Sequence, residues 1–223
     1  MTDLIETPTP VDTDDAERRS TRRRVIVIAV VAFAVLGVGL AVGLTRSSDP
    51  DPNWVELSTP IEMPDVVLTD TDGEPYDLSA ESNGRTTLLY FGYLNCPDAC
   101  PIHMAVLDHT FEQLAPDVRE AIDVVFVTTD PERDSPDDLG DFLDRFDPEF
   151  IGLTGSADEL RDAQVAAGVP VAVVEPADAD GEYLVGHATQ VLVFDDDGFA
   201  RRVYPFGVRQ SDWLADLPRL VES

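Results

Sequence analysis

The 223-residue chain contains no lysine, two cysteines and three histidines. Its 15 basic residues are all arginine, and they face 44 acidic residues, which leaves a formal net charge of −29. A surface with this excess of negative charge repels nucleic acid and anionic lipid. The sequence also shows no internal repeat, no phosphate-binding loop and no Ser/His/Asp arrangement. These absences argue against a nucleic-acid-binding protein and against the common hydrolase and nucleotide-binding classes.

The acidic excess lies entirely in the C-terminal part of the chain. Residues 1–48 hold six arginines and six acidic residues, so residues 49–223 hold nine arginines and 38 acidic residues. Self-repulsion of this strength occurs in halophiles, which suggests a high-salt habitat as a hypothesis. The alternative is that acidic loops keep an extracytoplasmic domain soluble. The melting temperature measured against salt concentration separates these two explanations.

Residues 25–44 form a run of 20 residues without a charge. At about 1.5 Å per residue, a helix of this length spans the roughly 30 Å hydrocarbon core of a bilayer. Five arginines lie between residues 18 and 24 and only Arg46 follows closely, so the N-terminus is predicted to be cytoplasmic. A cleavable signal peptide is the alternative, but its apolar core is usually about 7 to 15 residues. We therefore expect a single-pass protein of the cell membrane.

The rest of the chain divides around this predicted transmembrane helix. Residues 1–24 lack apolar periodicity and are predicted to be a disordered cytoplasmic tail, and residues 45–53 form a polar linker. Residues 54–223 are predicted to fold outside the membrane. Apolar runs such as "TTLLYFGYL" and "IDVVFVTTD" are typical of buried strands, and they alternate with amphipathic helical patterns. This order predicts an α/β fold with a central mixed sheet flanked by helices.

The two cysteines, Cys96 and Cys100, follow the first of these buried strands in the sequence "CPDACP". Open α/β sheets carry their sites at the carboxyl ends of such strands. Pro101 fits the first turn of a helix, so Cys100 is predicted to be the N-cap residue. Its thiol would then face the positive end of the helix, which favours the thiolate, while Asp98 opposes this effect.

The spacing of the cysteines leaves a disulfide, a redox pair and a metal site open. Positions i and i+4 on a helix place Cβ atoms about 5–6 Å apart, whereas a relaxed disulfide has them near 3.8 Å. One metal ion can hold two sulfurs roughly 4 Å apart. A permanent disulfide across so short a loop restricts little chain entropy, so we favour a redox or metal role. Two thiolates suit Cu(I), and an added imidazole would help to hold Cu(II) or zinc.

Three histidines and one methionine are candidates for a third ligand. His103 lies on a similar helical face and could swing toward the cysteines, whereas His109 lies about half a turn away. His187 precedes a buried strand, in a turn that could return over the cysteine loop. The local pattern favours a solvated or core role for each histidine, and a core role for Met104.

Three motifs, in this order, resemble the Sco/SenC family: "CPDACP", "VTTDPERDSPDDL" and "EYLVGHATQVLVFDDDG". The resemblance covers roughly residues 58–220. It implies a thioredoxin-like fold in which Cys96, Cys100 and His187 bind one copper ion. It also implies a role in assembling the dinuclear copper site of cytochrome c oxidase subunit II, by copper delivery, by thiol reduction or by both. The chain departs from the family at Gly186, where an aspartate is frequent, and at Asn95, where a histidine is frequent.

These observations lead to one leading hypothesis and two alternatives. The leading hypothesis is a membrane-anchored copper metallochaperone. The first alternative is a membrane-tethered thiol-disulfide oxidoreductase using Cys96 and Cys100, although such enzymes typically carry C-x-x-C. The second is a zinc site with an open position, which lacks an obvious general base. The "TDPERDSP" segment is interpreted as structural, a strand end followed by a capped helix.

Overall fold

The computed structural model describes residues 53–221. The predicted cytoplasmic tail, the predicted transmembrane helix of residues 25–44 and nearly all of the predicted linker lie outside the described residues. Within residues 53–221, no helix has both the length and the apolar character needed to cross a membrane.

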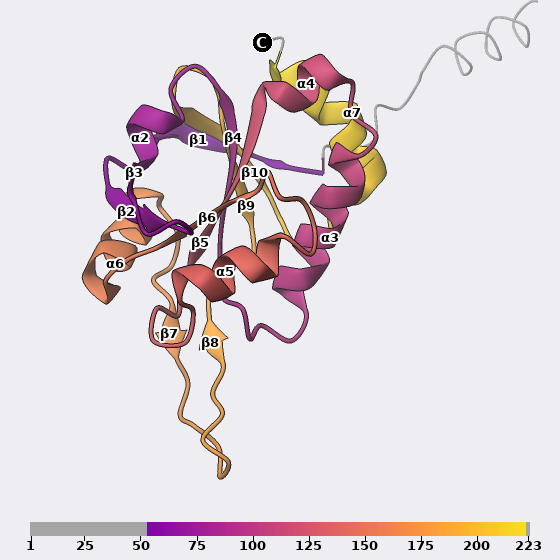
Figure 1. The fold of residues 1–223 in the computed structure, drawn as a ribbon. Coiled ribbons are helices and arrows are strands. Elements are labelled where there is room, and N and C mark those ends of the chain that lie inside the picture. The colour runs from indigo at the N-terminus through magenta and orange to yellow at the C-terminus, as the bar shows by residue number, and fades with distance from the viewer. Residues whose placement is uncertain (1–52, 222–223) are drawn as a thin grey trace, which may run out of the picture. The chain divides into compact units, whose positions relative to one another are not determined.

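The centre of the fold is a mixed sheet of eight strands in the order β1-β10-β9-β4-β5-β6-β2-β3 (Figure 1). The three strands β4, β5 and β6 are parallel, and antiparallel strands complete the sheet on both sides. The strands are β1 (Val55–Glu62), β2 (Val67–Asp70), β3 (Pro75–Asp77), β4 (Thr86–Gly92), β5 (Ile122–Thr128), β6 (Ile151–Thr154), β9 (Val191–Phe194) and β10 (Phe199–Tyr204).

Among the described residues, six helices accompany the sheet: α2 (Leu78–Glu81), α3 (Ala99–Phe111), α4 (Pro116–Glu120), α5 (Pro136–Leu143), α6 (Ala157–Ala166) and α7 (Gln210–Val221). Side chains of α3, α5 and α7 pack with one face of the sheet, and side chains of α2 and α6 pack with the other. Strand β4 is buried on both faces, because Leu88 and Tyr90 belong to the first core cluster and Leu89 and Phe91 to the second. The predicted mixed α/β sheet with flanking helices is confirmed.

Local sequence signals fixed two of the helix starts. Ser135 caps α5 and accepts a hydrogen bond from the backbone of Asp138, with Pro136 at the first helical position. Ser156 and Glu159 form a reciprocal capping box at the start of α6. Both helix starts therefore follow from short sequence patterns, a serine before a proline and a serine three residues before a glutamate.

A separate two-stranded ribbon projects from the body of the domain (Figure 1). It consists of β7 (Val173–Val174) and β8 (Val185–Gly186), which pair antiparallel. The chain runs from this ribbon through His187 into β9, which pairs antiparallel with β4. Because β4 is also followed by the cysteine loop, the topology brings these two segments to the same end of the sheet.

Candidate metal centre

Asp98, and not Cys100, is the N-cap residue of α3. Its carboxylate accepts a hydrogen bond from the backbone N–H of Ala99 at 2.6 Å, and the helix begins at Ala99. Carboxylate oxygens are strong acceptors at helix N-termini, whereas cysteine sulfur is a weak one. Pro101 is therefore the third helical residue, where its missing N–H still costs no hydrogen bond. The expectation that Cys100 caps the helix is wrong.

Cys96 is the cysteine whose sulfur lies at the helix start. The backbone N–H of Cys100 points at the Cys96 Sγ, at 3.4 Å. The pKa of Cys96 is lowered to about 4, chiefly because the Cys100 thiol donates a hydrogen bond to its sulfur. The pKa of Cys100 is raised, because it is the donor in that pair and because it is fully buried. The two pKa shifts favour the thiolate at Cys96 and the thiol at Cys100. The helix start was expected to act on the Cys100 thiol, and it acts on Cys96 instead.

His187 faces both sulfurs through one ring nitrogen. Its Nε2 lies 3.8 Å from the Cys96 Sγ and 3.7 Å from the Cys100 Sγ. Its Nδ1 lies 2.9 Å from the Phe91 carbonyl oxygen and 2.8 Å from that of Ala188. Carbonyl oxygens can only accept, so Nδ1 carries a proton, and Nε2 is the ring nitrogen directed at the two sulfurs. An aspartate at position 186 could accept a hydrogen bond from the His187 ring, and Gly186 cannot. Main-chain carbonyl oxygens accept that hydrogen bond instead.

The three side chains fit one metal ion. Their ligand atoms all lie within 4.8 Å of one another, and both cysteines are free. A trigonal ion with bonds of about 2.3 Å to sulfur and about 2.0 Å to nitrogen would need sulfur and nitrogen roughly 3.7 Å apart. The two measured separations match that value, and thiolates with an imidazole are donors that copper and zinc accept. Within the described part of the chain, no other group of at least three His, Cys, Asp or Glu side chains has this geometry.

The other candidate ligands lie outside this cluster. His103 is buried, and its Nε2 is 2.8 Å from the main-chain oxygen of Thr189, so it supports the segment that follows His187. His109 is exposed and lies near Glu112. Met104 is fully buried in the core, as its place in the helical stripe indicates.

Tyr90 and Gly92 belong to the site, although sequence reasoning did not single them out. The Tyr90 hydroxyl donates to the Cys100 Sγ at 3.5 Å, and burial raises the pKa of this tyrosine. A Cβ atom on Gly92 would lie 2.7 Å from the Cys100 Sγ and 2.8 Å from the Tyr90 ring, so only glycine fits beneath the cysteine. The sequence did contain a signal for the position of Tyr90. Side chains alternate along a strand, and this alternation places Tyr90 on the same face of the sheet as Leu88.

The "TDPERDSP" segment connects the cysteine loop to the segment that carries His187. The buried carboxylate of Asp134 accepts from the backbone N–H of Leu94 at 3.1 Å and from the Thr128 hydroxyl at 2.6 Å. The Tyr183 hydroxyl donates to Asp130 at 2.9 Å, and the Arg133 guanidinium lies 3.5 Å from the centre of the Tyr183 ring. The interpretation of this segment as a strand end followed by a capped helix is confirmed. The segment also holds the cysteine loop and the segment that carries His187 in place relative to each other.

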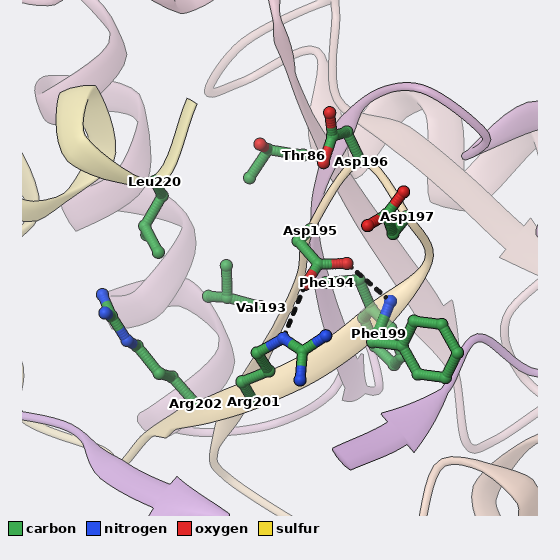
Figure 2. A pocket seen from close by; sticks show the side chains of 10 residues that line it. All are labelled: Thr86, Val193, Phe194, Asp195, Asp196, Asp197, Phe199, Arg201, Arg202 and Leu220. Atoms are coloured by element: carbon green, nitrogen blue, oxygen red, sulfur yellow. Dashed lines mark hydrogen bonds and ion pairs between the residues drawn. The ribbon is translucent and has the colours of Figure 1, made fainter. Parts of the chain in front are cut away.

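A cavity of about 340 Å³ lies at the opposite end of β4, next to Thr86 (Figure 2). Three consecutive aspartates, residues 195–197, line it together with Arg201 and Arg202. Asp195 is already engaged, because it accepts from the backbone N–H of Phe199 and from the Arg201 side chain. Strand β4 separates this cavity from the cysteines, which follow its other end.

The fold and the cluster of two cysteines and one histidine define a thioredoxin-like protein with a candidate metal centre. The SCO1/SenC family model matches residues 57–222, and the chain belongs to that family.

Relatives and solved structures agree with this assignment. A "Putative copper-binding protein" of Stutzerimonas stutzeri is 34% identical over 140 residues, which are 62% of this chain and 67% of that protein. The solution structure of apo Sco1 from Thermus thermophilus is 31% identical with a TM-score of 0.69, covering 78% of this chain and 100% of that one. Copper-bound ScoI of Bradyrhizobium japonicum is 30% identical with a TM-score of 0.61, covering 73% and 98%.

Proposed function

We propose that this chain is a membrane-anchored copper-binding protein that assists the assembly of the dinuclear copper site of cytochrome c oxidase subunit II. The observation that carries the proposal is the convergence of the Cys96 and Cys100 sulfurs on the Nε2 of His187, at 3.8 and 3.7 Å. Family membership and the copper-bound relative support it. Copper is the cargo of this function, so the site must both hold the ion and release it.

Cys96, Cys100 and His187 would hold one copper ion. The two thiolates suffice for Cu(I), and the imidazole adds the donor that Cu(II) favours. Cys96 enters this role already ionised, whereas Cys100 must lose its proton when the ion binds. Cys100 has no exposed surface, while His187 is half-buried, so the ion would enter and leave on the side of His187 and Cys96. Ligand exchange with thiolates of the recipient would then release it.

The membrane anchor of this proposal is the uncharged run of residues 25–44. With the N-terminus in the cytoplasm, the folded domain would stand outside the cell membrane, where a recipient subunit presents its copper site. The family model begins at residue 57, after the proposed anchor and linker.

A thiol reductase activity is a second candidate, and the unequal pair of thiols favours it. The Cys96 thiolate would attack one sulfur of a recipient disulfide and release the other sulfur as a thiolate. Cys100, after giving up its proton, would attack the Cys96 sulfur of the mixed disulfide and free the second recipient thiol. The recipient disulfide gains two electrons and the Cys96–Cys100 pair loses them.

A hydrolytic zinc centre is not favoured. Among the described residues no carboxylate belongs to the cluster of Cys96, Cys100 and His187, so such a centre would lack a general base.

A Cu(II) titration of the reduced soluble domain, residues 49–223, tests the proposal. Both core clusters consist of residues within the described range, so this part contains its own hydrophobic cores. A sulfur-to-copper charge-transfer band that saturates near one copper per domain is the expected result. Oxidation of both thiols without a stable coloured complex would instead favour the reductase.

A further inference from the structure

Apolar side chains gather on the projecting β7–β8 ribbon. Nine large hydrophobic side chains are exposed among residues 53–221, and four of them lie between residues 171 and 184. Their exposed fractions are 39% for Val171, 65% for Val173, 58% for Val174 and 48% for Leu184. The ribbon stands away from the rest of the domain (Figure 1). An exposed apolar cluster on an otherwise acidic domain is typical of a protein-binding surface.

The strand register places Val173 and Leu184 on the same face of the ribbon. Val173 pairs with Gly186 and Val174 with Val185, and the backbone N–H of Glu175 donates to the Leu184 oxygen. Val173 and Leu184 are therefore diagonal neighbours across the two strands, about 7–8 Å apart. Gly186 adds no side chain to this face, and Glu175, which lies opposite Leu184, adds an exposed carboxylate beside the apolar pair. We define the apolar face of the ribbon by Val173 and Leu184.

The opposite face of the same strand leads to the metal centre. Val185 is buried on this face, opposite the exposed Val174, and two residues after Val185 the chain reaches His187. Tyr183 is held by its hydrogen bond to Asp130. Leu184 of the apolar face lies three positions before His187 in the chain. A protein bound at this face would therefore lie beside His187.

The charge of the ribbon indicates which partner fits. Its exposed acidic residues are Glu175, Asp178, Asp180 and Glu182, and residues 162–200 contain no arginine or lysine. Asp178 also orders the tip, because its carboxylate accepts from the backbone N–H groups of residues 180 and 182. Two copies of this chain would repel each other at this surface. A partner segment with apolar side chains flanked by arginine or lysine would complement it.

We propose that the apolar face of the β7–β8 ribbon is the docking surface for the copper recipient, through an apolar segment of that protein flanked by basic side chains. This inference rests on the proposed function, which supplies the recipient. Docking would bring the recipient to the side from which the ion is reached.

The test measures binding of the full-length chain, purified in detergent, to the soluble copper domain of cytochrome c oxidase subunit II from the same organism. Fluorescence anisotropy gives the dissociation constant for the wild type and for Val173→Ser, Leu184→Ser and Val165→Ser. Val165 is the matched control, because it is 61% exposed on α6 and lies outside the ribbon. Copper stoichiometry is measured for each variant by the charge-transfer band.

We expect Val173→Ser and Leu184→Ser each to weaken binding about tenfold, since each removes roughly one buried apolar side chain from the interface. Val165→Ser should bind like the wild type, and all three variants should keep one copper per chain. Equal binding by all variants would overturn the docking proposal and leave the proposed function intact. No binding by a copper-loaded wild type would overturn both the docking proposal and the choice of recipient. Concentration-dependent self-association that the ribbon variants abolish would assign the face to a second copy instead.

Discussion

The protonated Nδ1 of His187 donates a hydrogen bond to the main-chain oxygen of Phe91, 96 residues earlier in the chain and 2.9 Å away. The end of the central strand β4 therefore orients the ring, and no side chain is required for this purpose. A backbone acceptor of this kind fixes the tautomer that leaves Nε2 free for a metal. This relationship explains how the site keeps its geometry with glycine at position 186.

His187→Ala should weaken Cu(II) binding by about a hundredfold or more, because loss of a ligand costs at least as much as loss of the groups that orient it. The two thiolates should still hold Cu(I), since they are the soft donors of the site. Competition with a chelator measures both affinities. His109→Ala is the control, because His109 is an exposed histidine outside the cluster. Equal Cu(II) affinity of His187→Ala and wild type would contradict the three-ligand site.

The alkylation rate of Cys96 in the reduced, metal-free chain should change little between pH 5 and pH 8. With a pKa of about 4, Cys96 is already the thiolate throughout this range, whereas an ordinary thiol would gain about tenfold in rate per pH unit. Iodoacetamide labelling followed by mass spectrometry gives the profile. Cys100→Ala removes the main hydrogen-bond donor, so its profile should rise with pH. Cys96→Ser should leave Cys100 unlabelled, and a steep wild-type profile would refute the assigned order of the two thiols.

The melting temperature of residues 49–223 should rise with salt if the acidic surface reflects a high-salt habitat. Screening weakens repulsion among the 38 acidic residues of this part. Each kcal/mol of repulsion removed should raise the melting temperature by about 2–4 °C for a domain of this size. Calorimetry between dilute buffer and concentrated salt measures the effect. A domain equally stable in both would favour the simpler explanation, solubility.

Features that depend on neighbouring residues were predictable from the sequence. Ser156 and Glu159 form their capping box within four residues, and the buried strand at residues 86–92 appears as an uninterrupted apolar run. The cap of α3 was mistaken because proline at position 101 fits more than one place in the first turn, and Asp98 is the better hydrogen-bond acceptor.

Contacts between distant segments could not be derived from local pattern. The residues alone left the third ligand open, and the resemblance selected His187. In the structure this choice follows from the pairing of β4 with β9, in which Leu89 lies opposite Leu192, so that His187 arrives beside the cysteine loop. The bond from Tyr183 to Asp130 joins residues 53 positions apart, and no local periodicity encodes it.

Tyr90→Phe should move the sulfur-to-copper charge-transfer band of the loaded domain to longer wavelength. The Tyr90 hydroxyl donates to the Cys100 sulfur, which stabilises the thiolate electrons, and its removal lowers the energy needed to transfer them. The buried ring is retained, so the free energy of unfolding should fall by only about 1 kcal/mol. Tyr204→Phe removes a hydroxyl that contacts Asp216, and it should leave the band unchanged. An unshifted band in Tyr90→Phe would exclude this hydrogen bond from the loaded site.

Asp134→Ala should weaken copper binding although Asp134 is not a ligand. Its carboxylate holds the backbone of Leu94, two residues before Cys96, and the hydroxyl of Thr128 at the end of β5. Removing it leaves the partly buried N–H of Leu94 and the buried hydroxyl of Thr128 without their acceptor, at a cost of about 2–3 kcal/mol in the free energy of unfolding.

Urea denaturation measures that loss of stability, and a chelator competition measures copper affinity under conditions in which the variant is fully folded. Asp141→Ala is the matched control, because Asp141 is an exposed aspartate on the neighbouring helix α5. We expect copper affinity to fall about tenfold or more in Asp134→Ala and to stay unchanged in Asp141→Ala. If Asp134→Ala lost stability but bound copper as tightly as the control, its carboxylate would stabilise the fold without positioning the cysteine loop for the ion.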